Sequence, residues 1–138
     1  MKKIFLLITL SFFSLPTLAE TTKLELLNGR VRNIPPTAPM SAAYGTLKNN
    51  GMSKIKILSG SSNCSKTVEL HETRESEGVM QMRKVKHYLI MAKGRLDLKP
   101  GGKHIMLIGL NETFKSQKTC KITLQSESES FSFELPKR

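Results

Sequence analysis

The chain has 138 residues and a formal net charge of +11, from 22 basic and 11 acidic side chains. This length allows one ordinary domain rather than several. The basic side chains are scattered without a long run, and only 6% of residues are aromatic, which argues against a surface that stacks nucleic-acid bases. We interpret the charge as a solvated surface, with attraction to an acidic protein or membrane surface as the alternative.

The first residues have the pattern of an export signal. Lys2 and Lys3 precede an apolar stretch too short to span a membrane, and the triplet ending at Ala19 fits a cleavage site of small residues. We therefore predict a signal peptide over residues 1–19 and a single mature domain over residues 20–138. No later stretch has the ~20 apolar residues of a transmembrane helix, so the mature chain is expected to be a soluble periplasmic protein.

The mature chain contains two cysteines, Cys64 and Cys120. An oxidising compartment and an even count favour one disulfide between them. The chain-entropy model gives such a long closed loop a stabilisation of roughly 4 kcal/mol, at the upper end of the usual range. The alternative is a pair of thiol metal ligands, which is less favoured because neither cysteine belongs to a Cys-x-x-Cys pair.

Short segments of alternating polarity, separated by turn residues, run through the mature chain. The expected strands are KLELLNGRVR, AAYGTLKN, SKIKILSG, KTVELHET, GVMQMRKV, GRLDL, HIMLIGL, CKITLQ and SFSFEL. Asn28-Gly29 predicts a turn or bulge inside the first strand, Asn49-Asn50-Gly51 ends the second, and Glu75–Gly78 is a charged turn. No segment has a sustained helical period. The pattern predicts an all-β fold, a Greek-key sandwich of about seven to nine strands.

Histidines and methionines recur in three of these segments. His71 follows the last inward-facing leucine of one strand, and Met82 lies in the next strand. His104 and Met106 are two residues apart, so their side chains project from the same face of one strand. If pairing brings the three segments together, two imidazole nitrogens and two thioether sulfurs can reach a common point.

Two imidazoles and two thioethers form a soft set of ligands, and Cu(I) is the first-row ion that soft sulfur selects. A blue-copper site would need a cysteine beside two histidines, and neither cysteine is placed for that. Taken singly, a methionine is usually a packing residue and a histidine near a strand end a surface residue. We assign this ordinary role to the remaining residues of both types, Met40, Met52, Met80, Met91 and His87.

The spacing of the four candidate ligands carries a resemblance. His71 is followed by ten residues and Met82, then by twenty-one residues and His104-Ile105-Met106. This is the signature of the PCuAC family of periplasmic copper chaperones, in which a His or Met precedes the same spacings. The surrounding segments VELHET, GVMQMRKV and LKPGGKHIMLIGL are also similar to that family, and the resemblance extends from about Ala42 to Phe133.

The resemblance implies a cupredoxin-like β-sandwich that binds one Cu(I) through His71, Met82, His104 and Met106. It also implies delivery of copper to a cuproenzyme, such as the CuA or related centre of a haem-copper oxidase, often alongside a Sco-type thiol protein. The chain departs from some relatives because it lacks a His- and Met-rich C-terminal tail. The cysteine pair is outside the signature, and we interpret it as a structural staple.

Two other functions fit the sequence. The chain could be a metal-free periplasmic interaction module that binds a partner through its basic surface, or a copper sequestration or resistance protein that retains its metal. An enzyme is not expected, because no Ser/His/Asp set, paired carboxylate site or phosphate loop stands out.

Overall fold

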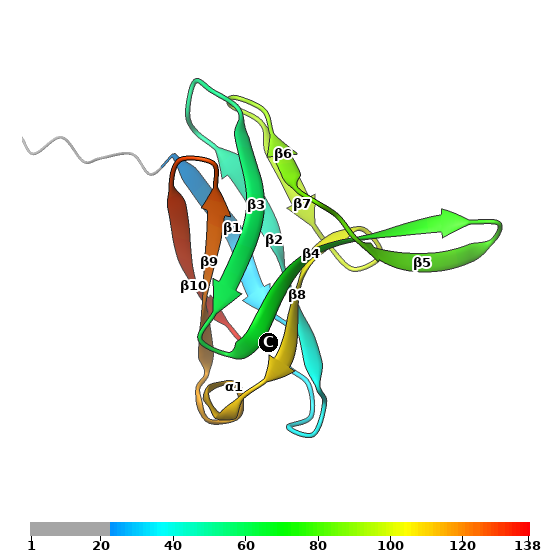
Figure 1. Cartoon of the computed structure of the whole chain (residues 1–138). Coiled ribbons are helices and arrows are strands. Elements are labelled where there is room, and N and C mark those ends of the chain that lie inside the picture. Colours follow the sequence, from blue (N-terminus) through cyan, green and yellow to red (C-terminus); the bar gives the residue numbers. More distant parts are fainter. Residues whose placement is uncertain (1–22) are drawn as a thin grey trace, which may run out of the picture.

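The computed structural model describes residues 23–138, which form ten strands and one short helix (Figure 1). The elements are β1 (Leu24–Val31), β2 (Met40–Asn49), β3 (Ile55–Ser62), β4 (Ser65–Ser76), β5 (Val79–Lys84), β6 (Tyr88–Ile90), β7 (Arg95–Leu98), β8 (Lys103–Leu110), α1 (Glu112–Ser116), β9 (Thr119–Ser126) and β10 (Ser130–Pro136). The all-β prediction is confirmed, and every strand except β6 matches an expected segment. The predicted signal peptide lies outside the described residues.

The strands pair in the order β1-β2-β8-β4-β3-β9-β10, while β5, β6 and β7 pair with β4, β3 and β2 respectively. At the ends of this order, Val31 of β1 forms a parallel bridge with Lys137, the residue that follows β10. The backbone N–H of Arg138 also donates to the carbonyl oxygen of Val31 over 2.9 Å. The sheet therefore curls round into a barrel-like sandwich (Figure 1).

The Asn28-Gly29 pair forms the irregularity that the sequence predicts. The β1–β2 register shifts between Leu27 and Arg30, and Asn28 has a φ of 52°, a left-handed conformation that Asn tolerates better than most residues. A Cβ atom on Gly29 would lie 2.6 Å from a methyl carbon of Leu135. Glycine at this position leaves room for the Leu135 side chain of β10 to pack against the bulge.

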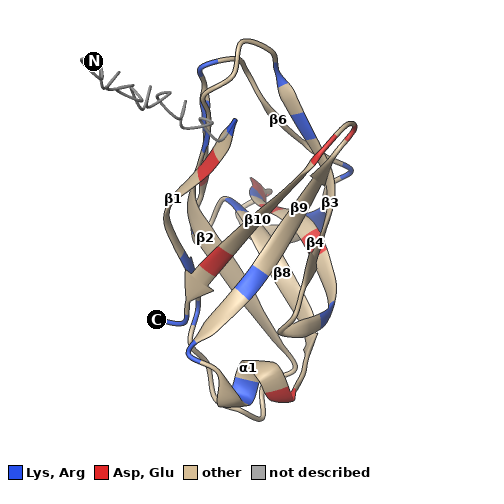
Figure 2. Cartoon of the chain, turned by 90° about the vertical axis from the view of Figure 1, so that its left-hand side faces the viewer, with Lys and Arg blue, Asp and Glu red and all other residues tan. Residues whose placement is uncertain are grey.

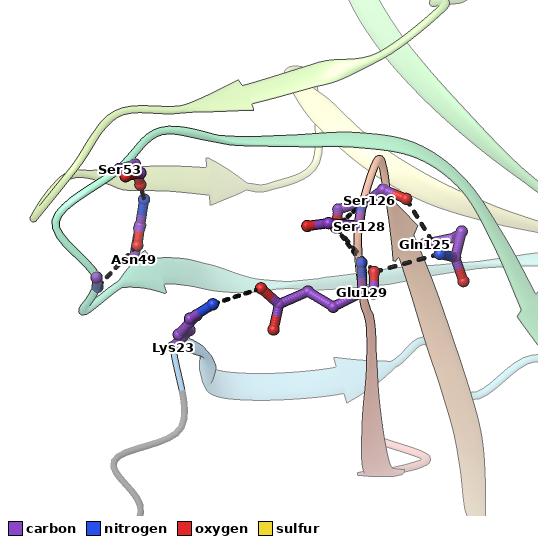
Figure 3. Close-up of polar contacts among 8 residues, drawn as sticks. Lys23, Asn49, Ser53, Gln125, Ser126, Ser128 and Glu129 are labelled. Carbon is purple, nitrogen blue, oxygen red and sulfur yellow. Dashed lines mark hydrogen bonds and ion pairs between the residues drawn. The ribbon is translucent and has the colours of Figure 1, made fainter.

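Asn49 ends β2 with its fully buried side chain. Its amide nitrogen lies 2.8 Å from the carbonyl oxygen of Ser53, and its amide oxygen accepts from the N–H of Gly51 at 2.9 Å (Figure 3). The same nitrogen also lies within hydrogen-bonding distance of the carbonyl oxygens of Ile90 and Met91. The predicted turn is thus held by one amide, which also fastens the loop to the end of β6.

Alternate side chains of the strands fill the interior of the barrel. Cys64 and Cys120 form a disulfide and are fully buried beside the apolar core. Figure 2 shows the Lys and Arg residues distributed over several strands rather than gathered on one element. Within residues 23–138, no helix has the length and apolar composition needed to cross a membrane.

Three features differ from the sequence prediction. The strand count is ten rather than seven to nine, because three-residue strands such as β6 are too short to show an alternating pattern. The five-residue helix α1 was not expected; its N-cap is Asn111, whose side chain accepts from the N–H of Phe114. Strand β4 continues to Ser76, so His71 lies within a strand rather than at its end.

The long β4 pairs with β5 to form a hairpin that projects away from the barrel (Figure 1). All six residues of β5 are exposed. The inner half of β4 pairs with β8 in the barrel wall. Strand β4 thus carries His71 in the barrel wall, and its outer half pairs with β5, which carries Met82.

Candidate metal centre

The register of β4 and β8 places the two predicted histidine ligands side by side. His71 lies directly opposite His104, and directly opposite residues share one face of a sheet. The centroids of the two imidazole rings are 5.8 Å apart. His104 is 3% exposed and the side chain of His71 is 14% exposed, so both rings are largely screened from water.

Met106 lies on the same face as His104, two residues further along β8. The flanking Ile105 and Leu107 are fully buried in the main core, whereas Met106 packs in a separate small cluster with Ala42 and Tyr44 of β2. The predicted shared face of His104 and Met106 is therefore confirmed, and Ile105 and Leu107 pack on the opposite face. Packing on both sides holds the thioether in the barrel wall.

Met82 of β5 lies opposite Thr73 of β4, and Thr73 shares a face with His71 because the two are two residues apart. Met82 is 55% exposed. Together with His104 and Met106, it lines a shallow surface hollow of about 310 Å³. The structure thus gathers three of the four predicted ligands around one hollow. His71 does not line it, but its ring lies beside that of His104.

Each imidazole has one nitrogen engaged and one nitrogen bare. Nδ1 of His104 lies 3.0 Å from the carbonyl oxygen of Gly102, and Nε2 of His71 lies 2.9 Å from a carboxylate oxygen of Glu69. Both oxygens are acceptors, so the engaged nitrogens carry the protons of the neutral rings. The other two nitrogens, Nδ1 of His71 and Nε2 of His104, are buried and have no hydrogen-bond partner among the described residues. Two buried lone pairs of this kind fit metal ligation.

Glu69 is a neighbour of the candidate site that the sequence analysis did not single out. Its carboxylate accepts from His71 and also from the ammonium of Lys84 at 2.8 Å. The hydrogen bond from His71, followed by that from Lys84, lowers the pKa of Glu69 below its ordinary value. The carboxylate therefore stays charged and fixes both the tautomer and the orientation of the His71 ring. The sequence did contain a signal for this contact, because residues two apart on a strand, such as Glu69 and His71, share a face.

Tyr88 of β6 holds the backbones of both histidines from the core side. Its buried hydroxyl lies 2.6 Å from the carbonyl oxygen of His71 and 2.7 Å from that of His104, and accepts from the N–H of His71 at 3.1 Å. Burial is the main reason why the pKa of Tyr88 is raised above its ordinary value. The hydroxyl therefore remains a proton donor and fastens β4 to β8 where the two imidazoles meet.

Replacing Tyr88 by phenylalanine is expected to lower the free energy of unfolding by about 1–3 kcal/mol, because it leaves the buried backbone groups of His71 and His104 without their partner. Urea denaturation measures this loss. Tyr44→Phe is the control, because the hydroxyl of Tyr44 takes part in none of these three hydrogen bonds. Equal stability of Tyr88→Phe and the wild type would show that the hydroxyl does not fasten the two strands.

The donor set limits the metals that this face could bind. Among residues 23–138, no group of three or more His, Cys, Asp and Glu side chains is arranged to hold a metal ion. Hard cations such as Ca²⁺ and Mg²⁺ need several oxygen ligands. A metal at this face would have to combine the two bare imidazole nitrogens with thioethers, and such a combination favours a soft ion.

Solved structures with a similar fold are PCuAC domains and DR1885 of Deinococcus radiodurans. The "Copper-bound PCuAC domain from PmoF2" has a TM-score of 0.68 and 14% identity, covering 85% of this chain and 93% of that domain. The Cu(I) form of DR1885 has a TM-score of 0.65 and 28% identity, with 87% and 83% of the two chains covered. Its apo form has a TM-score of 0.62 and 26% identity, with 100% and 96% covered. The predicted cupredoxin-like β-sandwich is confirmed.

The family described as "Putative lipoprotein LpqE-like" matches residues 24–136, and the chain belongs to this LpqE-like family. A relative from Leifsonia xyli subsp. xyli, "Putative lipoprotein Lxx21020", is 34% identical over 87 residues, which are 62% of this chain and 52% of the relative. "Uncharacterized protein RP573" of Rickettsia prowazekii is 36% identical over 76 residues, 54% and 42% of the two chains. The matched part of the chain thus spans about half the length of these relatives.

These relationships bear on two predictions. The matched family is described as a putative lipoprotein family and the solved neighbours are PCuAC domains; neither description is that of an enzyme, in agreement with the sequence prediction. Kinship with lipoproteins also indicates an exported protein.

Proposed function

We propose that the chain is a periplasmic metallochaperone that binds one Cu(I) through His71, Met82, His104 and Met106. The observation that carries the proposal is a pair of buried imidazole nitrogens that have no hydrogen-bond partner within residues 23–138, on the same sheet face as two thioethers. The Cu(I) form of DR1885, similar over most of both chains, supports the choice of metal. Copper is the cargo, and the chain supplies soft, uncharged ligands that suit the reduced ion.

The fold holds the four side chains with unequal firmness. His71, His104 and Met106 are largely buried on β4 and β8, whereas Met82 is half-exposed on the projecting β5. A thioether on an exposed hairpin has more rotamers available than one packed in the wall. We therefore assign Met82 as the ligand that is released first when copper passes to an acceptor.

The acceptor in this proposal is a thiolate-bearing cuproenzyme, such as the CuA or related centre of a haem-copper oxidase. Thiolates are softer than imidazoles and carry charge, so they can take Cu(I) from neutral ligands by exchange. The part of the chain that the structure describes contains no free cysteine, and its disulfide is fully buried. Reduction of the acceptor would therefore fall to a separate, Sco-type thiol protein.

An anaerobic Cu(I) titration of residues 20–138 against a coloured Cu(I) chelator tests the proposal. We expect one equivalent to be withheld from the chelator and then to move to a reduced CuA domain when the two proteins are mixed. Retention of copper in the presence of that domain would favour sequestration. Failure of the folded protein to compete for Cu(I) would reject the proposal and favour a metal-free interaction module.

Replacing Glu69 by glutamine is expected to weaken Cu(I) binding by about 10–100-fold, the range typical of hydrogen-bond partners of metal-bound histidines. The amide keeps the shape of the side chain but no longer stabilises one tautomer of His71. Glu72→Gln is the matched control, because Glu72 accepts from Lys103 and Arg74 rather than from a predicted ligand. The same chelator competition measures both variants, and equal affinities would remove Glu69 from the site.

A further inference from the structure

The hollow that contains Met82, His104 and Met106 is lined by a third methionine, Met40. Met40 is the first residue of β2 and lies opposite Ile108 of β8. The next pair along these strands on the same face is Ala42 with Met106. Because directly opposite residues share a face, the side chains of Met40 and Met106 belong to one side of the barrel wall and are diagonal neighbours.

The exposure of the methionines separates Met40 from ordinary packing residues. Met106 is 7% exposed, whereas Met40 is 45% and Met82 55% exposed. The two exposed thioethers reach the hollow from different elements, one from the start of β2 and one from the projecting β5. Met52, Met80 and Met91 are exposed as well but do not line it. The hollow thus has one thioether in its wall and two that are open to solvent.

We propose that Met40 is an auxiliary Cu(I) ligand through which the metal enters and leaves the site. This inference rests on the proposed function. Its thioether donates a lone pair to Cu(I) while another ligand dissociates, so the ion stays coordinated throughout the exchange. Copper remains Cu(I), and no covalent bond, proton or electron is transferred. An unbranched, polarizable thioether is well suited to such transient contact.

The assignment replaces the ordinary packing role that the sequence suggested for Met40. Leucine at this position would preserve the apolar character and approximate volume without offering sulfur. A pure packing residue would therefore tolerate Met40→Leu with no effect on copper. An exchange ligand would instead show its loss in the rate of copper movement rather than in the final affinity.

The test compares the wild type, Met40→Leu and Met52→Leu, since Met52 is 82% exposed and outside the hollow. Each protein is loaded with one equivalent of Cu(I), and its transfer to an excess of a coloured chelator is followed by stopped flow. We expect Met40→Leu to transfer about tenfold more slowly, equivalent to roughly 1.4 kcal/mol in the barrier. Met52→Leu is expected to match the wild type in rate and affinity, and Met40→Leu to change the transfer rate much more than the equilibrium affinity.

A second measurement tests the assignment of Met40 without relying on the rate of copper transfer. In the wild type labelled at its methionine methyl groups, Cu(I) is expected to shift the NMR signal of Met40 but not those of Met52 and Met91. The wild type could bind Cu(I) while Met40→Leu transfers copper at the normal rate and the Met40 signal does not shift. That result would overturn the assignment of Met40 but leave the proposed function standing. A wild type that binds no Cu(I) would overturn the proposed function instead.

Discussion

Replacing His104 by alanine is expected to weaken Cu(I) binding by more than about 100-fold, beyond the effect typical of an outer hydrogen-bond partner. His104 contributes a buried Nε2 that has no hydrogen-bond partner in the described part of the chain, and its Nδ1 is fixed by the carbonyl oxygen of Gly102. It is also a histidine that lines the hollow beside two predicted thioether ligands. Chelator competition under anaerobic conditions measures the affinity of the folded variant.

His87→Ala is the matched control, because His87 is exposed in a different surface pocket with Lys54 and Lys56. It should bind Cu(I) like the wild type. Since removal of a buried ring can also destabilise the fold, Met106→Leu provides a second variant that nearly conserves volume. Met106→Leu should unfold like the wild type but bind Cu(I) much more weakly. Wild-type affinity in both His104→Ala and Met106→Leu would exclude β8 as a source of ligands.

Replacing Cys64 and Cys120 together by alanine is expected to lower the free energy of unfolding by about 4 kcal/mol, the chain-entropy figure for a loop of this size. The two cysteines are 56 residues apart in sequence, and the bond ties the chain before β4 to β9. Urea denaturation measures the loss. The folded fraction should retain its Cu(I) affinity, because neither cysteine lines the hollow.

Two results would contradict this account of the cysteines. A loss of less than about 1 kcal/mol, well below the typical range for a disulfide, would show that the bond does not constrain the unfolded chain. Loss of Cu(I) binding in a variant that is still folded would show that the cysteines belong to the metal centre rather than to a structural staple.

Most of the fold could be predicted from local sequence signals. Alternating polarity marked the longer strands, and Asn28-Gly29 marked the bulge in β1 because only a few residue types tolerate its backbone conformation. The missed elements are those that tertiary contacts define. Strand β6 has three residues and α1 has five, so neither contains enough of its own period to be recognised.

The candidate site was also predictable only where local sequence signals, rather than tertiary contacts, place its residues. The face shared by His104 and Met106 follows from their spacing alone, whereas the position of His71 opposite His104 depends on the register of two distant strands. Glu69 could have been found from the same alternation, since it lies two residues from His71. Tyr88 could not, because its hydroxyl reaches the two backbones across the core from a strand that shows no pattern of its own.

X-ray absorption at the copper K-edge tests the central claim most directly, because it reports the oxidation state and the atoms bound to the metal in one spectrum. The measurement uses the folded protein with one equivalent of copper under anaerobic conditions. We predict Cu(I) bound by a mixture of imidazole nitrogen and thioether sulfur, with two of each in the complete site. A spectrum that contains nitrogen and oxygen neighbours but no sulfur would contradict the assignment of Met82 and Met106 and, with it, the proposed metallochaperone.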